Sequence, residues 1–303
     1  MSNYDMIMES FIDVEADLIA MEAEIDDNPT HTAEFNKVIT DRVDKIVQRA
    51  IKKVDEEIMK LNDRKKALDT QLKAFTTEYN GLRNSYQPEK QIQIVNYEYD
   101  SNVLDQQESN AKALFVDGYN KIAGIVSNPD RITAKNNILG ADYRRVVSAI
   151  LDKYNTPKNI TTPDGVYADT KNRFRGKKRV QTIGNGALNQ YVTESKNVGN
   201  IVNNAATALN DVKTKISSIS RVLDGFIRNG SNTQEHKKRL PKIVRNFISL
   251  ANFYIGMIMY CFELRIEKVV NSRVIIKTFY KKENSKQLQK QKRIEEGDKN
   301  AQG

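Results

Sequence analysis

The most chemically distinctive run in this chain is basic: six of the nine residues from 171 to 179 are Lys or Arg, and Phe174 stands among them. Such a run can bind a phosphate backbone, because guanidinium groups pair with phosphates and an aromatic ring stacks on a base. It can equally dock an acidic protein segment or form a solvated loop, and no motif for base-specific recognition accompanies it. The candidate contact residues are Lys171, Arg173, Phe174, Arg175, Lys177, Lys178 and Arg179.

Few residues of the types that catalysis and metal binding most often use are present in this sequence. His31 and His236 are the only histidines, and Cys261 is the only cysteine and lies in an apolar run. A metal cage or a nucleophile with a histidine base needs more such residues close together. Gly184 and Gly186 do not begin a phosphate-binding loop, because no Gly-Lys-Ser/Thr follows them. We therefore expect no enzyme activity, no metal and no cofactor, with Cys261 buried in a reducing environment.

Charge is distributed unevenly along the chain. The first 36 residues contain ten acidic side chains and no Lys or Arg, whereas the other 267 contain 48 basic and 29 acidic side chains. In the acidic part, apolar residues recur at steps of 3 and 4, which predicts an amphipathic helix from about residue 3 to residue 25. This helix should bind a basic partner, either the basic remainder of the same chain or a basic surface elsewhere. Its apolar seam consists of Ile7, Phe11, Val14, Leu18, Met21 and Ile25.

A second apolar line predicts a helix of about 50 residues, or about 75 Å at 1.5 Å per residue. It follows the turn at Asn28-Pro29 and ends before Pro88. A helix of this length has to pack along another long helix, project from the domain or join an oligomer. The line runs through Val43, Val47, Ala50, Val54, Ile58, Leu61, Leu68, Leu72, Phe75, Tyr79, Leu82 and Tyr86.

The middle of the chain is less regular. Residues 91–99 alternate polar with β-branched and aromatic residues, which indicates a strand, the only one we expect. Helices should follow at about 103–126 and 130–154, the second beginning at the helix-starting sequence Asn128-Pro129-Asp130. Residues 155–186 contain two prolines and four glycines without a helical period, and they predict a basic flexible linker.

The second half restarts with the cleanest heptad seam in the chain, which ends at the turn sequence Arg228-Asn-Gly-Ser-Asn232. A further helix is expected from Thr233 to Tyr280, and two long helices joined by a short turn should form an antiparallel hairpin. Beyond residue 280 the chain is Lys/Gln-rich with little to bury, which predicts a frayed helical end or a disordered tail. The seam consists of Val198, Val202, Ala205, Leu209, Val212, Ile216, Ile219, Leu223 and Phe226.

Residues 246–262 contain no charged side chain and are flanked by Arg245 and Glu263. A membrane-spanning helix needs about 20 apolar residues, and Ser249 and Asn252 weaken this shorter run. Basic residues on both sides of the run give no orientation preference. We therefore expect a helix buried on every face at the centre of a bundle, with membrane insertion as the alternative.

The composition favours long helices, because the 303 residues include only 14 Gly and 6 Pro. The predicted fold class is all-α, an elongated helical bundle with a long heptad helix and a C-terminal antiparallel helical hairpin. Oligomeric state stays open, because 4-3 spacing serves a bundle within one chain as well as a coiled coil between chains. The predicted segments are an acidic amphipathic helix (1–28), a long-helix bundle (29–154), a basic flexible linker (155–186), a helical hairpin (187–280) and a disordered tail (281–303).

The run from residue 7 to residue 22 resembles the acidic amphipathic leaders of internal head proteins in large tailed bacteriophages. The resemblance implies that the leader joins the scaffold core of an assembling head. It also implies that a maturation protease cuts after a glutamate preceded two places earlier by Ile or Leu. The triplets Ile7-Met-Glu9 and Ile294-Glu-Glu296 fit that rule, whereas Glu22 follows Ala20 and does not fit.

The sequences 218–227 and 247–254 also resemble helices of virion proteins from such phages. We therefore expect a non-enzymatic, virion-associated structural or assembly protein that packs through amphipathic helices and is assembled in the host cytoplasm. Its partners would be other virion or scaffold proteins, nucleic acid or further copies of itself, and no membrane partner is expected. The alternatives are a nucleic-acid-binding accessory protein that uses residues 171–179, a membrane-active protein that uses residues 246–262, and a cytoplasmic location.

Overall fold

The structure, a computed structural model, describes six helices and four strands. The helices are α2 (Glu15–Asp27), α3 (Ala33–Ser85), α4 (Ser101–Ser127), α6 (Asn185–Lys196), α7 (Val198–Arg228) and α8 (Gln234–Ala301). The strands are β1 (Ile92–Glu98), β2 (Lys158–Thr162), β3 (Gly165–Asp169) and β4 (Lys177–Ile183). The described residues are therefore 15–27, 33–85, 92–98, 101–127, 158–162, 165–169, 177–183, 185–228 and 234–301.

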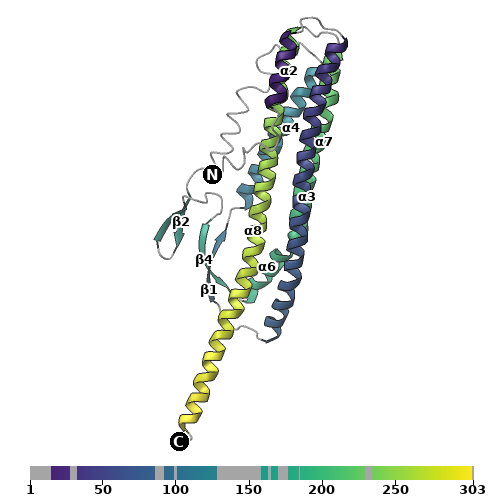
Figure 1. Ribbon diagram of the computed structural model, residues 1–303. Helices are drawn as coiled ribbons and strands as arrows, with labels where there is room; N and C mark the ends of the chain where they lie inside the picture. The colour runs from purple at the N-terminus through teal and green to yellow at the C-terminus, as the bar shows by residue number, and fades with distance from the viewer. Residues whose placement is uncertain are drawn as a thin grey trace. The chain divides into compact units, whose positions relative to one another are not determined.

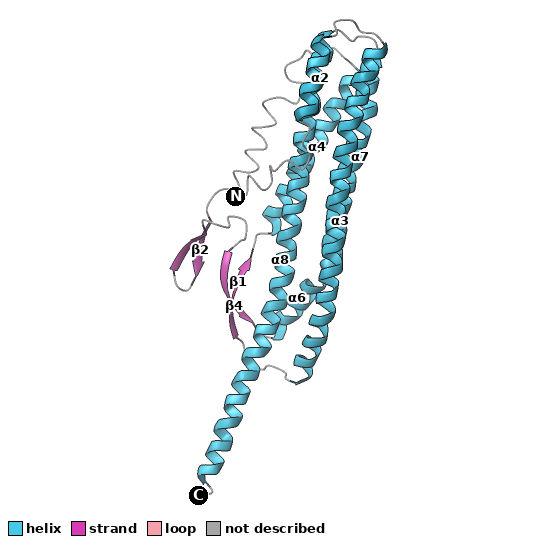
Figure 2. Cartoon of the chain, viewed as in Figure 1, coloured by secondary structure: helices cyan, strands magenta, loops and turns pink. Residues whose placement is uncertain are grey.

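Helices dominate this part of the chain, and the fold is an all-α helical bundle, as the sequence predicts (Figures 1 and 2). The predicted division into consecutive segments does not match the compact units of the structure, because α3, α7 and α8 each contribute residues to two units. Unit 1 comprises residues 1–61, 101–156 and 203–262, and unit 2 comprises residues 62–100, 157–202 and 263–303.

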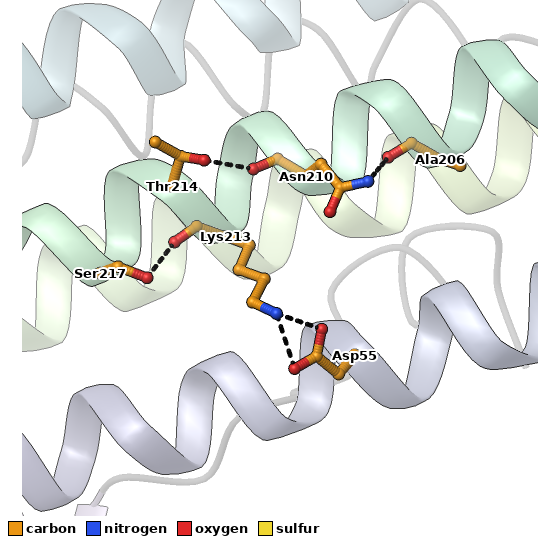
Figure 3. Close-up of polar contacts among 6 residues, drawn as sticks. All are labelled: Asp55, Ala206, Asn210, Lys213, Thr214 and Ser217. Carbon is orange, nitrogen blue, oxygen red and sulfur yellow. Dashed lines mark hydrogen bonds and ion pairs between the residues drawn. The ribbon is translucent and has the colours of Figure 1, made fainter.

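In unit 1, α3 and α7 lie side by side and run antiparallel. Lys213 of α7 donates to both carboxylate oxygens of Asp55 of α3, at 2.6 and 2.9 Å (Figure 3). Nearer the start of α3, Thr40 donates to Asp224 of α7 at 3.4 Å. The residue number on α7 rises as the number on α3 falls, and this order fixes the antiparallel direction.

The helix α4 lies along α7 in the parallel direction. Lys112 pairs with Asp211 at 3.7 Å, and one helical stretch further on Ser218 donates to the hydroxyl of Tyr119 at 2.9 Å. Residue numbers therefore rise together on the two helices. The predicted helix over 103–126 is confirmed by α4, whereas the predicted helix over 130–154 lies outside the described residues.

Aromatic contacts place α4 against α8. The rings of Phe115 and Tyr254 have centroids 5.6 Å apart, and those of Tyr119 and Phe247 are 6.4 Å apart. Residue numbers rise on α4 as they fall on α8, so these two helices are antiparallel. Because α4 is parallel to α7, it follows that α7 and α8 run antiparallel, as the predicted hairpin requires (Figure 1).

The heptad seam of α7 is buried, as its spacing predicts. Steps of 3 and 4 keep one face of a helix turned to its neighbours, and burying that face is what stabilises the packing. The side chain of Phe226 lies outside the described part of the structure. The buried seam residues are Val198, Val202, Ala205, Leu209, Val212, Ile216, Ile219 and Leu223, each at most 6% exposed.

The uncharged run at 246–262 is a core segment of α8 in unit 1. All but three of its 17 residues are buried, and Phe247, Phe253 and Ile258 are at most 1% exposed. By length and composition alone, α8 is the one described helix that could cross a membrane, and 78% of its apolar window is buried. The expectation of a core helix is therefore confirmed, as is the burial of Cys261.

In unit 2, α3 and α8 run parallel. Arg64 approaches Glu263 at 4.0 Å, and Glu78 pairs with Lys277 further along both helices. The helix α6 completes the unit's core, which lies around the fully buried ring of Phe279. The buried core residues are Phe75, Leu188, Ile275, Ile276, Phe279 and Tyr280.

The predicted flexible linker over 155–186 is wrong, because three strands lie within it. The predicted strand at 91–99 is confirmed as β1, and its antiparallel partner is β4, with Ile92 opposite Ile183 and Glu98 opposite Lys177. The strands β2 and β3 form a second antiparallel pair. Both pairs belong to unit 2, so the segment is part of a compact unit instead of a connection between domains.

The predicted disordered tail is also corrected, since α8 continues to Ala301. Glu283 is the last residue of α8 that the structure describes as buried, and every residue from 285 to 296 is exposed. The prediction of disorder is wrong because a segment with few apolar residues to bury can still form a helix. Lys, Gln, Arg and Glu are all good helix formers, and a helix that has already begun grows by one hydrogen bond per residue.

Candidate interaction surfaces

The acidic helix buries its apolar seam within unit 1, as far as it is described. Leu18 and Met21 of α2 are 0% exposed, and Ile25 is 1% exposed. Burial of side chains of this size contributes about 1.5 to 3 kcal/mol each relative to exposure. The other predicted seam residues, Ile7, Phe11 and Val14, lie outside the described residues.

One edge of α2 pairs with α3. Arg42 donates from Nε to Glu24 at 2.8 Å and also pairs with its second oxygen through Nη2. Arg49 pairs with Asp17. The two arginines are seven residues apart on α3 and the two acids seven apart on α2, so both pairs lie on matching turns of antiparallel helices.

The other edge of α2 pairs with α8. Lys238 contacts Asp26 at 3.0 Å, and Arg245 donates to Glu15 at 2.9 Å. The sequence left open whether the basic partner of the acidic helix belongs to the same chain or to a scaffold protein. For the described part of α2 the basic partners are α3 and α8 of its own chain.

The contact between Glu24 and Arg42 changes the titration of both groups. The hydrogen bond from Arg42 lowers the pKa of Glu24 below its ordinary value, against a smaller opposing effect of burial. The same hydrogen bond raises the pKa of Arg42. A carboxyl whose folded pKa is depressed stabilises the fold above its unfolded pKa, near 4.3, and loses that stabilisation as pH falls through the folded pKa.

We expect Glu24→Gln to lower the free energy of unfolding by about 0.5 to 1 kcal/mol at pH 7, the upper range for a partly exposed pair. The difference from wild type should shrink as pH falls from 5 to 3, because both proteins then lack the carboxylate. Urea titration at each pH measures it, and Glu22→Gln, at an exposed position of α2, is the matched control. A difference that stays constant across this pH range contradicts the assignment.

The structure places only part of the predicted basic contact run. Lys177, Lys178 and Arg179 are the first three residues of β4, where the register sets them opposite Glu98, Tyr97 and Asn96 of β1. They therefore belong to a paired strand and not to a loop. The remaining predicted contact residues, Lys171, Arg173, Phe174 and Arg175, lie outside the described residues.

Comparison with known protein families, curated proteins and solved structures found no match to this chain. The stretches that form unit 2 contain 25 Lys and Arg and 15 Asp and Glu, a balance of +10, whereas those of unit 1 contain 23 and 24, a balance of −1. The acidic N-terminal stretch neutralises unit 1, and unit 2 carries the net positive charge of the protein.

Among the described residues, exposed basic side chains are grouped near the end of α8, drawn in yellow in Figure 1. Residues 284–294 contain four basic side chains and no acidic one. Lys290, Lys292 and Arg293 are all exposed there, and the side chain of Lys286 is 58% exposed. The Lys/Gln-rich composition beyond residue 280 is the sequence signal of this basic surface.

A buried cation in unit 2 was not anticipated from the sequence. Arg273 of α8 is 6% exposed, donates from Nη2 to the carbonyl of Ser195 at 3.1 Å and lies over the ring of Phe75 at 5.9 Å. Burial lowers the pKa of Arg273, against the opposing field of Asp69. A donor at this place satisfies a carbonyl at the C-terminal end of α6, where the helix has no further N–H groups to bond it.

Metal ligands do not gather in the part of the chain that the structure describes. No group of three or more His, Cys, Asp or Glu side chains there is arranged to hold an ion. His236 belongs to the first turn of α8, and His31 lies outside the described residues. The surfaces of interest are therefore helix faces and charged patches.

Proposed function

We propose that this chain is a non-enzymatic structural protein that assembles with other proteins of a virion through its amphipathic helices. The observation that carries the proposal is the way in which its helices of 53, 31 and 68 residues are used. Their apolar positions are buried in long seams, and their polar positions form ion pairs between helices. This pattern is typical of proteins whose role is packing, and coiled-coil contacts with further copies or partners belong to the proposal.

The virion location is supported by the resemblance of residues 7–22 to phage leader sequences. The helix α2 begins at Glu15 and forms ion pairs with α3 and α8. Removing residues 1–27 would therefore disturb the fold of unit 1 as well as any targeting signal. Removing residues 2–14 keeps every described residue of α2.

We expect the chain to be a stoichiometric component of particles purified from its native source and to lose incorporation when residues 2–14 are deleted. Mass spectrometry of washed particles measures both, and it also reports whether the N-terminus begins at Ser10, as a cut after Glu9 requires. The control is a deletion of residues 298–303, at the opposite end of the chain. Recovery of the wild-type chain only in the soluble fraction contradicts the proposal.

A second function, nucleic-acid binding, is favoured by the charge of unit 2. The net charge is +10 in unit 2 and −1 in unit 1, so the positive charge of the protein is concentrated in one unit. Such a local excess of positive charge attracts a polyanion. Phosphate contacts make affinity fall steeply with salt, whereas burial of apolar seams hardly responds to salt. The two functions are therefore separable by one variable, and they do not exclude each other.

A further inference from the structure

Four basic side chains lie along one face of α8 near its C-terminal end. Lys282, Lys286, Lys290 and Arg293 follow one another at steps of 4, 4 and 3, and all four are exposed. At 3.6 residues per turn these positions fall within an arc of about 80° and span about 16 Å along the helix. We call these four residues the basic stripe.

The acidic groups on this part of α8 lie at the two ends of the basic stripe. Lys286 contacts the buried carboxylate of Glu283 at 3.0 Å, one turn earlier on the same helix. Between Lys286 and Arg293 the chain has no acidic residue on any face of the helix. Glu295 and Glu296 follow Arg293 within one turn and are exposed, so residues 282–296 carry five basic and three acidic side chains, and the middle of the stripe is the part that keeps a positive charge.

The geometry points to the phosphate backbone of a nucleic acid as the ligand of the basic stripe. Four residues of helix advance by about 6 Å, and each strand of duplex DNA carries one negative charge per 3.4 Å of axis. Successive cations of the stripe lie about 4.5 to 6 Å apart along the helix axis, so the stripe presents its positive charges over a length that spans several phosphates of a duplex. Such a contact depends on the phosphate charges and does not depend on the base sequence.

An acidic helix is a poorer partner for this surface. A partner helix needs an apolar seam to bury, as α7 shows in unit 1, and the apolar residues here are Leu288 and Ile294, which are 58% and 54% exposed. They lie six residues apart and therefore about 120° apart around the helix, so they do not form a seam. The same absence of an apolar face disfavours insertion into a lipid surface.

The test measures binding of the full-length protein to a fluorescently labelled 30-base-pair DNA duplex by anisotropy between 50 and 200 mM salt. The variant carries Lys282→Gln, Lys286→Gln, Lys290→Gln and Arg293→Gln, which keep good helix formers at exposed positions. Four lost phosphate contacts should reduce the slope of log affinity against log salt by about 3 to 4. At 100 mM salt we expect the affinity to fall at least about 100-fold.

A matched control removes four positive charges elsewhere. Lys37, Lys45, Lys52 and Lys53 are exposed on α3 in unit 1, and their replacement by Gln changes the net charge of the chain by the same amount. We expect the salt slope of this control to change by less than about 1. Equal losses in the two variants would show that overall charge, and not the stripe, binds DNA, which overturns the proposal.

Two further measurements keep the result unambiguous. A variant with Arg at Lys282, Lys286 and Lys290 keeps the charges and should retain wild-type affinity, and an unchanged salt slope in the Gln variant overturns the proposal. Competition by a peptide of residues 15–27 as effective as unlabelled duplex would identify an acidic helix as the ligand instead. The inference is independent of the virion assignment, because it concerns the purified chain and DNA alone.

Discussion

Replacing Leu209 with alanine is expected to lower the free energy of unfolding of unit 1 by about 2 to 5 kcal/mol. Leu209 is 0% exposed and lies at the centre of the α7 seam. Alanine is the strongest helix former, so the loss comes from the removed methyl groups and the cavity they leave, not from helix propensity. Urea denaturation followed by circular dichroism measures the change from the shift of the transition midpoint.

Leu288→Ala is the matched control for this measurement. The chemistry of the substitution is the same, but Leu288 is 58% exposed on α8. An exposed substitution of this kind usually changes stability by no more than about 0.5 kcal/mol. Similar losses at the two positions would mean that the α7 seam is not the packed face, and the description of unit 1 would then be wrong.

The second large effect is expected at Arg273, whose replacement by alanine should destabilise unit 2 by about 2 to 4 kcal/mol. The side chain is almost fully buried, so its removal leaves the carbonyl of Ser195 without its donor and a cavity beside Phe75. Hydrogen exchange of the α6 amides reports the loss locally, because α6 is the helix whose end the guanidinium satisfies.

Arg273→Met separates the two parts of that loss. Methionine fills much of the same volume but donates no hydrogen bond, so we expect it to cost about half as much as alanine. Arg293→Ala, on the exposed end of α8, is the control and should be close to neutral. If methionine is as damaging as alanine, the hydrogen bond to Ser195 accounts for the whole effect and packing against Phe75 for none.

Hydrophobic periodicity was sufficient to predict the long helices. The nine-residue seam of α7 and the apolar line of α3 follow directly from steps of 3 and 4, and the buried residues Val43, Val54 and Leu68 lie on the predicted line. Such spacing is informative because a helix brings every third or fourth residue to the same face. The uncharged run in α8 was similarly diagnostic of a core helix.

The strands of unit 2 were harder to predict, because a strand depends on a partner that is distant in the sequence. β1 and β4 are paired although about 80 residues separate them. The β-branched residues Val180, Thr182 and Ile183 indicate a strand at β4. The three basic residues that precede them are equally typical of an exposed loop, and this second pattern led to the prediction of a linker. A lone strand implies a second strand elsewhere in the chain, since unpaired strand edges are costly.

The placement of charge could not be obtained from the linear sequence. The division at residue 36 separates acidic from basic residues along the chain, whereas the fold assigns the basic excess to unit 2 and leaves unit 1 near neutrality. Ion pairs such as Lys213–Asp55 and Arg245–Glu15 join residues from distant stretches. Buried polar contacts such as that of Arg273 carry no periodic signature, so they too become visible only in three dimensions.

The ion pairs on the two edges of α2 make the spacing of its residues more important than the identity of any one of them. Asp17 and Glu24 face α3, while Glu15 and Asp26 face α8. A substitution at any one of these positions alters a single contact, and the others can hold the helix in place. One residue inserted between Asp17 and Glu24 would instead turn half of the helix by about 100° and break the match on both edges together. Variation within this segment should therefore take the form of exchanges and avoid insertions and deletions.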